Sequence, residues 1–502
     1  MGLARVLSRA CAGVCAPGVV VETHLSGGLP RVAIVGMPRK AVTEARDRVR
    51  AALMNCGFDY PARNITVSLA PAELPKDGGC FDLPIALGII AASRQCRSKR
   101  LKGTEFLGEL SLAGELQAVR GILPAALRAR AAGHRLVVPL ANSAEAALLA
   151  QGPIFCARSL SEVVAWLNGE DVLAVPEADA ATRPARAPDL KEVIGQQLPR
   201  RALELCAAGG HNLLMCGPPG TGKTMLAARL PGLLPPMTEA EALESAAIAS
   251  VSHGGFSPDQ WRQRPFRAPH HTASAIALVG GGQSPQPGEI SLAHQGVLFL
   301  DELPEFPRRV LDSLREPLEA GTITISRASA QADFPAVFQL VCAMNPCPCG
   351  YAGDPAANCR CSHEQVQRYA ARISGPLMDR IDLQVQVLRP DPALLHATTM
   401  NGEDSATVRQ RVGVARAQQL QRQSVTNARL SSNALRQHCG LKAKEQKLLT
   451  RAARQLQLSP RACHSIMRVA RTIADLDGRE QIALEHLSEA IGLRRPVQAK
   501  AP

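Results

Sequence analysis

The chain has 502 residues, enough for about two to four domains, and 46% of them are hydrophobic, which is ample for buried cores. It has no apolar run near the ~20 residues that span a bilayer, and arginines interrupt its short apolar N-terminus, so we expect no membrane span, no secretory signal and a cytoplasmic location. The net charge of +13 lies mostly in residues 405–502, which contain 18 Lys or Arg and 6 Asp or Glu. This excess of positive charge indicates nucleic-acid binding. The alternative is that the charged helix faces are solvated or pair with acidic neighbours in an oligomer.

The first 168 residues mix strand-like and helix-like patterns. Alternating apolar residues predict strands, and apolar residues at helical spacing predict helices. The expected strands are 18–24, 31–35 and 64–69, and the expected helices are 39–56, 84–92 and 124–132. These patterns predict an α/β or α+β domain over 1–168. Residues 169–189, rich in Ala and Pro, predict a linker.

A polar turn within this domain, P-K-D-G-G-C, ends at Cys80. The turn resembles the P-K-D-G-P-S segment of Lon-type proteases, whose serine attacks the peptide bond. Residues 107–127 resemble the Lon segment that supplies the partner lysine, but Ile122, Leu123 and Pro124 follow Gly121 here, and no lysine is present. The resemblance therefore implies a Lon-protease-like (ribosomal-protein-S5-like) α/β domain without its catalytic dyad. We interpret Cys80 as a small turn residue, with a cysteine nucleophile as the alternative.

A phosphate-binding pattern follows the linker. Residues 211–228 read H-N-L-L-M-C-G-P-P-G-T-G-K-T-M-L-A-A, a short apolar strand, a glycine-rich loop and the start of a helix. Backbone N–H groups of such a loop curl around phosphates, and the helix N-terminus adds its positive dipole. Lys223 is placed for the β- and γ-phosphates of ATP, and Thr224 for Mg²⁺. The predicted ATP-binding residues of this loop are Gly217, Pro218, Pro219, Gly220, Thr221, Gly222, Lys223 and Thr224.

Two later apolar runs complete a hydrolysis pattern. The run V-L-F-L-D-E predicts a buried strand that ends in Asp301, a second Mg²⁺ and ATP contact, and Glu302, the general base for the attacking water. The run Q-L-V-C-A-M-N predicts another strand that ends in Asn345, which could orient that water. A strand, loop and helix followed by two such strands in this order predict an ATPase.

Longer motifs support a family resemblance. R-P-F-R-A-P-H-H-T-A-S, P-G-E-I-S-L-A-H-Q-G-V-L-F-L-D-E-L-P-E-F and M-N-P-C-P-C-G-Y resemble the ComM/YifB family of magnesium-chelatase-like AAA+ ATPases, which carry a helix-2 insertion. The resemblance extends over nearly the whole chain. It implies an AAA+ core over 190–390 and a basic helical lid over 391–502. The helical patterns of that lid cover residues 406–423, 443–457, 460–476 and 483–493.

The resemblance assigns three arginines. I-S-G-P-L-M-D-R-I-D matches the arginine-finger element, which makes Arg380 the group that acts on a neighbouring subunit's ATP. L-S-P-R-A matches the sensor-2 arginine of the lid and gives Arg461. Residues 322–336 match a hairpin that projects into the central channel, with one strand at Ile323 and Ile325, a polar tip over 327–331 and the return from Phe334; Arg327 at the tip would contact DNA. The alternative for each is a surface ion pair.

Four cysteines cluster in the loop after Asn345. Cys347, Cys349, Cys359 and Cys361 lie in a segment rich in Pro, Gly and Asn, which has little core to bury. Tetrahedral thiolate ligation of structural Zn²⁺ explains the cluster, with unligated thiols or another metal as alternatives. The adjacent His270 and His271 cannot share one face of an element, and we interpret them as hydrogen-bonded structural histidines, with contact to nucleic acid or to a subunit interface as the alternative.

The family resemblance implies an ATP-driven, hexameric DNA motor. It would be a branch-migration helicase that promotes integration of single-stranded DNA during natural transformation, acting on single-stranded or branched DNA with ATP and Mg²⁺. A magnesium-chelatase motor subunit is the first alternative. A non-enzymatic or proteolytic regulator is the second, and intact Lys223, Asp301 and Glu302 disfavour its non-enzymatic form.

Overall fold

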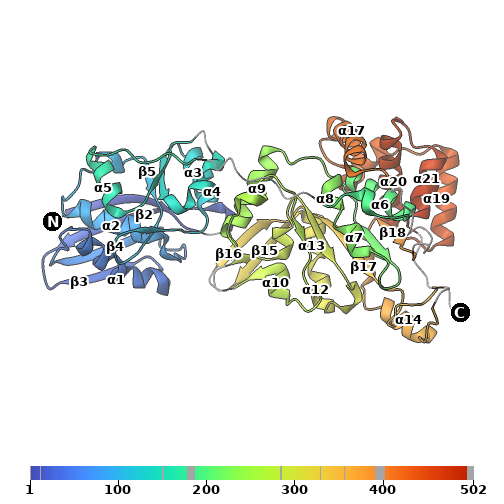
Figure 1. The fold of residues 1–502 in the computed structure, drawn as a ribbon, viewed down its shortest axis with the longest axis horizontal. Helices are drawn as coiled ribbons and strands as arrows, with labels where there is room; N and C mark the ends of the chain where they lie inside the picture. Colours follow the sequence, from blue (N-terminus) through green and yellow to red (C-terminus); the bar gives the residue numbers. More distant parts are fainter. Residues whose placement is uncertain are drawn as a thin grey trace.

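The computed structural model describes residues 2–11, 13–149, 152–177, 187–282, 285–327, 330–354, 357–389 and 402–494. Three parts follow one another along the longest axis of the molecule: an N-terminal α/β part, a central α/β part and a C-terminal helical part (Figure 1). The predicted α/β fold class is confirmed. The middle of the predicted linker, residues 178–186, lies outside the described residues.

The N-terminal part is built on a seven-stranded mixed sheet in the order β3-β4-β2-β1-β5-β8-β9. The long strands alternate buried and partly exposed residues, as expected for a sheet with one covered face. Its main strands are β1 (Gly2–Arg9), β2 (Gly18–Ser26), β3 (Arg31–Val35), β4 (Asn64–Ala70), β5 (Thr104–Phe106), β8 (Arg135–Pro139) and β9 (Ile154–Ala157). The short strands β6 (Glu109–Leu110) and β7 (Leu116–Gln117) form a separate hairpin. Its helices are α1 (Lys40–Asn55), α2 (Asp82–Ala92), α3 (Ile122–Ala131), α4 (Ser143–Ala146) and α5 (Leu160–Asn168).

The central part contains a five-stranded sheet whose strands are all parallel, in the order β11-β14-β17-β10-β18. Its middle strands are buried along their whole length, as expected for a sheet covered on both faces. The strands are β11 (Phe266–Arg267), β14 (Val297–Leu300), β17 (Gln339–Met344), β10 (Leu213–Cys216) and β18 (Leu383–Gln386). Its helices are α6 (Gln197–Gly209), α7 (Lys223–Ala227), α8 (Leu230–Leu233), α9 (Glu239–Val251), α10 (Ala275–Val279), α11 (Glu289–Leu292), α12 (Arg308–Ser313), α13 (Arg315–Ala320), α14 (His363–Ala370) and α15 (Gly375–Met378).

Two hairpins extend from the central sheet. The first is β12 (Gly280–Gly281) with β13 (Gln286–Pro287), and the second is β15 (Thr322–Arg327) with β16 (Ala330–Pro335). A Cβ atom on Gly280 would lie 2.6 Å from Cδ1 of Ile325, so the two hairpins pack directly on each other and this position excludes a side chain. The hairpin predicted over 322–336 is present in the backbone, but its return strand begins at Ala330 rather than at Phe334, so Arg327 and Gln331 of the predicted tip are paired strand residues. The Arg327 side chain and residues 328–329 lie outside the described residues.

The C-terminal part is helical, as its sequence pattern predicts. Ser459 caps the N-terminus of α20, and Pro460 occupies its first turn, where the missing N–H is not needed. The helices are α17 (Ser405–Gln423), α18 (Ser432–His438), α19 (Ala443–Gln455), α20 (Pro460–Leu476) and α21 (Leu484–Gly492). In the described ranges we find no helix with the length and apolarity that crossing a membrane requires.

The N-terminal part packs on the central part. Helix α3 packs on α9, and the buried Glu145 accepts a hydrogen bond from the Ser250 hydroxyl across that junction and another from the Leu123 N–H of its own part. The turn at Gly13 also reaches β16, since a Cβ there would lie 3.5 Å from the Phe334 ring. The N-terminal part therefore touches the base of the β15–β16 hairpin.

Candidate functional site

The phosphate-binding loop joins β10 to α7 at the carboxyl edge of the central sheet. Gly220 and Gly222 have φ of 76° and 86°, in the left-handed region that glycine adopts without strain. The Lys223 ammonium donates to the carbonyls of Gly217 and Pro218, at 2.7 and 2.9 Å. Burial lowers the pKa of Lys223, and the nearby Asp301 carboxylate opposes that shift. The lysine therefore lies inside the loop, where it can reach a phosphate that enters.

The ends of β14 and β17 bring the other predicted hydrolysis residues to this loop. The Thr224 hydroxyl donates to Asp301 at 2.8 Å, and Lys223 donates to the Asn345 amide oxygen at 3.2 Å. These contacts form because β17 lies between β10 and β14, so the three strand ends meet at one edge. Hydroxyl and carboxylate oxygens are the ligands that Mg²⁺ prefers, so Thr224 and Asp301 fit a nucleotide-bound Mg²⁺. Glu302 follows directly, with half of its side chain exposed.

A histidine contacts Glu302, which the sequence interpretation missed. The Nδ1 atom of His271 lies 2.9 Å from a Glu302 carboxylate oxygen, whereas His270 bonds locally to the Thr272 hydroxyl. The contact arises because β11 pairs in parallel with β14, so the segments that follow both strands meet. The backbone of Glu302 has φ of 52°, unusual for a residue other than glycine. The candidate base is thus held by both its backbone turn and a side-chain partner.

The two arginines predicted to contact ATP lie together, but away from this loop. Arg380 and Arg461 both pair with Glu319 of α13, at 2.5 and 2.6 Å. The hydrogen bond from Arg461, together with the charge of Arg380, holds the pKa of Glu319 below its usual range. Among the interactions given for the described residues, none joins either arginine to Lys223 or Glu302 of the same chain.

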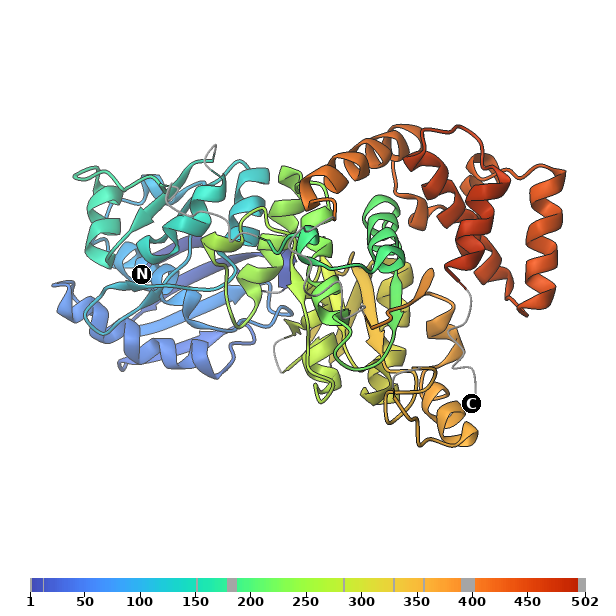
Figure 2. The ribbon, with the colours of Figure 1, turned by 45° about the vertical axis from the view of Figure 1, so that its right-hand side comes forward.

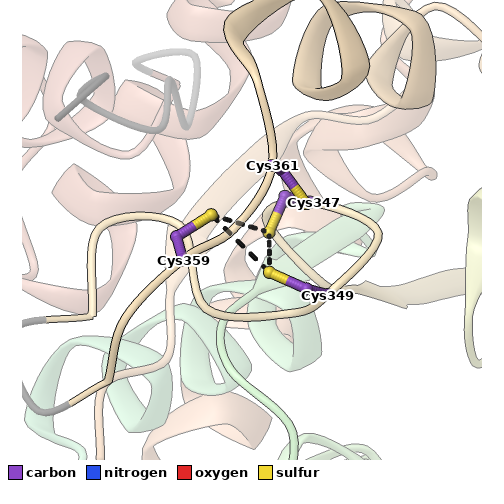
Figure 3. Close-up of side chains that lie close together, drawn as sticks. All are labelled: Cys347, Cys349, Cys359 and Cys361. Atoms are coloured by element: carbon purple, nitrogen blue, oxygen red, sulfur yellow. Dashed lines mark hydrogen bonds between the residues drawn. The ribbon is translucent and has the colours of Figure 1, made fainter.

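The four loop cysteines converge (Figure 3). The Cys347 sulfur lies 3.3 Å from that of Cys349 and 3.7 Å from that of Cys359, and with Cys361 all four sulfurs lie within 4.8 Å of one another. Four converging thiols match the donor set of a structural zinc site with no open position.

The cysteine loop also packs against the phosphate-binding loop. Gly350 has φ of 88°, and a Cβ there would lie 2.8 Å from Cδ of Pro219. Since Asn345 comes two residues before the first cysteine, the loop links the cysteine cluster to two sides of the ATP site.

Cys80 lies at the turn as predicted and is buried. A hydrogen bond with the Cys11 thiol and burial raise its pKa well above the usual value, so it remains a thiol rather than a nucleophilic thiolate. Among the described residues, neither histidine nor lysine lines the 430 Å³ cavity around it. The contact with Cys11 was not predicted, because Cys11, which follows β1, is distant from Cys80 in the sequence.

The parallel five-stranded order with the phosphate-binding loop after β10, the acidic end of β14 and the C-terminal helical part together define an AAA+ P-loop ATPase. Comparison with known families agrees. Residues 189–394 match the family described as magnesium chelatase, subunit ChlI; residues 21–142 match subunit ChlI of Mg-chelatase; and residues 402–494 match its C-terminal region.

Full-length relatives define the family more narrowly. The chain is 51% identical to competence protein ComM of Haemophilus influenzae, over 99% of this chain and 98% of that protein. It is 49% identical to the uncharacterized protein YifB of Salmonella typhimurium, over 98% and 97%. The magnesium-chelatase 67 kDa subunit of Heliobacterium mobile is 26% identical over only 40% of this chain. The chain belongs to the ComM/YifB family of magnesium-chelatase-like AAA+ ATPases.

Proposed function

We propose that the chain is an ATP-driven DNA motor that works as a hexameric ring and migrates branches or displaces strands during recombination of incoming single-stranded DNA. The observation that carries this proposal is the meeting of Lys223, Thr224, Asp301, Asn345 and Glu302 at one sheet edge. The printed name of the Haemophilus relative, a competence protein, supports the DNA context. A role on DNA would place the protein in the cytoplasm.

Each residue at this edge has a proposed role in hydrolysis. Lys223 binds the β- and γ-phosphates of ATP, and the loop N–H groups surround them. Glu302 accepts a proton from the attacking water, and Asn345 orients that water. Thr224 and Asp301 would hold a Mg²⁺ ion, which would supply positive charge beside the phosphates.

The roles proposed for Arg380 and Arg461 require a second subunit. Both arginines pair with Glu319 rather than with their own loop, which suits groups that reach an ATP bound by a neighbour. There Arg380 would stabilise charge that develops on the γ-phosphoryl group. Arg461, which the sequence motif assigned to the lid sensor, would act beside it.

Two further parts have proposed roles. Cys347, Cys349, Cys359 and Cys361 hold a structural zinc that fixes the loop beside the ATP site. The N-terminal part is a Lon-protease-like domain without proteolytic activity, because neither a histidine nor a lysine lines the cavity at Cys80 among the described residues and the raised pKa keeps the thiol protonated. Its contact with the β16 strand suits a role in bracing the hairpin.

The decisive experiment measures ATP hydrolysis with no DNA, with single-stranded DNA and with a branched DNA. A DNA motor should hydrolyse ATP several-fold faster with DNA, and with branched DNA it should release a labelled strand. A rate of ATP hydrolysis that does not change when DNA is added would contradict the proposal and favour a chelatase-type motor. The limited identity to the chelatase subunit makes that second function the weaker one.

A further inference from the structure

The basic residues of the C-terminal helical part differ in whether they have partners within the molecule. Most of its described arginines form ion pairs or hydrogen bonds with other residues of the chain. Arg422 and Arg471 share Asp475, for example, and Arg411 pairs with Glu204 and Glu403. The arginines that bond to carboxylates or carbonyls within the molecule are Arg409, Arg411, Arg416, Arg422, Arg461, Arg468, Arg471 and Arg494.

Helix α19 is different. Lys447, Arg451 and Arg454 are exposed, and none of the ion pairs given for the described residues includes them. They are spaced at i, i+4 and i+7, so they lie on one face of the helix. At 1.5 Å per residue this face extends for about 10 Å. Like charges at this spacing repel one another, so the arrangement is unfavourable without an anionic partner.

The surroundings of these cations suit a phosphate backbone. A shallow depression of about 630 Å³ on α19 is lined by the three cations together with uncharged residues, namely Ala443, Gln446, Thr450 and Gln455. Amide and hydroxyl side chains donate to phosphate oxygens in nucleic-acid complexes. The single acid of the helix, Glu445, is buried away from this face. Leu448 and Leu449 pack toward the core, which fixes the basic face outward.

We propose that this α19 basic face, Lys447, Arg451 and Arg454 with the polar residues between them, binds the sugar–phosphate backbone of DNA without regard to sequence. The proposal rests on the proposed DNA motor and adds a second contact to it. Figures 1 and 2 show the helical part at the end of the molecule opposite the N-terminal part, and in Figure 1 α19 lies far from β15 and β16. The face would therefore hold a flanking arm of a branched DNA while the hairpin engages the translocated strand.

The test is a triple variant, Lys447→Gln with Arg451→Gln and Arg454→Gln. Glutamine forms helices about as well as lysine and arginine, so thermal unfolding should be unchanged. Binding of branched DNA, measured by fluorescence anisotropy over a range of salt concentrations, should weaken by about tenfold, and the slope of log K against log salt should fall by about 2 to 3. ATP hydrolysis without DNA should be unchanged, and strand release should recover at saturating DNA.

The matched control removes three exposed cations elsewhere, by Lys102→Gln with Arg128→Gln and Arg130→Gln in the N-terminal part. It should keep the parental affinity and salt slope. Equal losses in both triple variants, or none in the α19 variant, would overturn the proposal. The proposal would also be overturned if light scattering showed that the α19 variant no longer forms the ring, because the face would then be a subunit contact. Binding of the parent to anionic phospholipid vesicles without DNA, lost in the α19 variant, would overturn it as well. A parent that does not bind DNA contradicts the motor function itself.

Discussion

Individual contacts hold the residues of the candidate ATP site together. Lys223 is held by loop carbonyls and by Asn345, and Thr224 is held by Asp301. A phosphate and Mg²⁺ would exchange into these contacts without rebuilding the loop. Such preorganisation lowers the cost of binding and of charge stabilisation. The contact between His271 and Glu302 extends this order to the candidate base.

His271 is predicted to position Glu302. In His271→Ala the half-exposed carboxylate loses its partner, so the turnover number should fall by about tenfold while KM for ATP stays near the parental value. His271→Asn can still donate a hydrogen bond to the carboxylate and should recover much of the rate. The neighbouring His270→Ala is the control: its ring lies 4.1 Å from that of His271, but its hydrogen bonds among the described residues are to Thr272 and none reaches Glu302. Parental turnover in His271→Ala would remove the histidine from the mechanism.

At the scale of elements, two segments connect the ATP site to the rest of the protein. The cysteine loop follows β17 and packs on the phosphate-binding loop through Gly350 and Pro219. Helix α13 carries Glu319 and leads, through Gly321, into the β15–β16 hairpin. Glu319 lies three residues before β15, so a change in its ionic partners would occur at the base of the hairpin that carries the candidate DNA contact.

Zinc in the cysteine loop is predicted to stabilise the ATP site. Protein purified without chelators should carry about one zinc per chain by elemental analysis. Cys347→Ser or Cys359→Ser should lower the zinc content, the melting temperature and the affinity for ATP together, because the loop packs on Pro219. Cys96→Ser, outside the cluster, serves as the control. Metal-free protein of parental stability would eliminate the zinc proposal.

The hairpin is predicted to transmit hydrolysis to DNA through Arg327. Arg327→Ala should keep its DNA-independent ATPase, since Lys223 and Glu302 are untouched. It should lose DNA-stimulated turnover and strand displacement, and the salt slope of DNA binding should fall by about 1, because one phosphate contact is gone. An Arg327→Ala protein that displaces strands as well as the parent would show that the hairpin tip is not a DNA contact.

At the scale of the whole molecule, the proposed ring would divide each ATP site between two subunits. One face carries Lys223 and Glu302, and another carries Arg380 and Arg461 on Glu319. A ring in which each subunit offers one face to the next would join the two halves. The helical part is locked to the face with the arginines, since Ser459 donates to Asp379 and the buried Arg494 guanidinium donates to the Asp382 carbonyl.

Mixing inactive variants tests this division. Glu302→Gln should bind ATP and hydrolyse it at least about 100-fold more slowly, because it lacks the base. Arg380→Ala should be similarly slow, because it lacks the arginine of the neighbouring site. In an equal mixture, about a quarter of the interfaces join an intact Glu302 to an intact Arg380, so activity should return toward that fraction. A mixture as inactive as its components would place Arg380 in its own subunit's site or outside catalysis.

The sequence by itself determined the residues whose chemistry depends on local order. A glycine-rich loop between an apolar strand and a helix, and acids or amides at the ends of buried strands, are short patterns with fixed geometry, so Lys223, Thr224, Asp301 and Asn345 could be predicted to meet. The α/β class and the C-terminal helices were predictable for the same reason, because apolar periodicity is local. The convergence of the four cysteines could also be predicted from the sequence, because they lie within 15 residues of one another.

Only the tertiary structure decided the contacts between distant segments. His271 reaches Glu302 because β11 pairs with β14, and Glu319 of α13 pairs with both Arg380, which follows α15, and Arg461 of α20, although the three residues are far apart in the sequence. The +12 charge of residues 405–502 looked uniform in the sequence, yet internal ion pairs and hydrogen bonds engage most arginines of the described part and leave Lys447, Arg451 and Arg454 of α19 without an ion pair among the described residues. Packing between helices determines which charged side chains find a partner within the molecule, and no local sequence pattern encodes that packing.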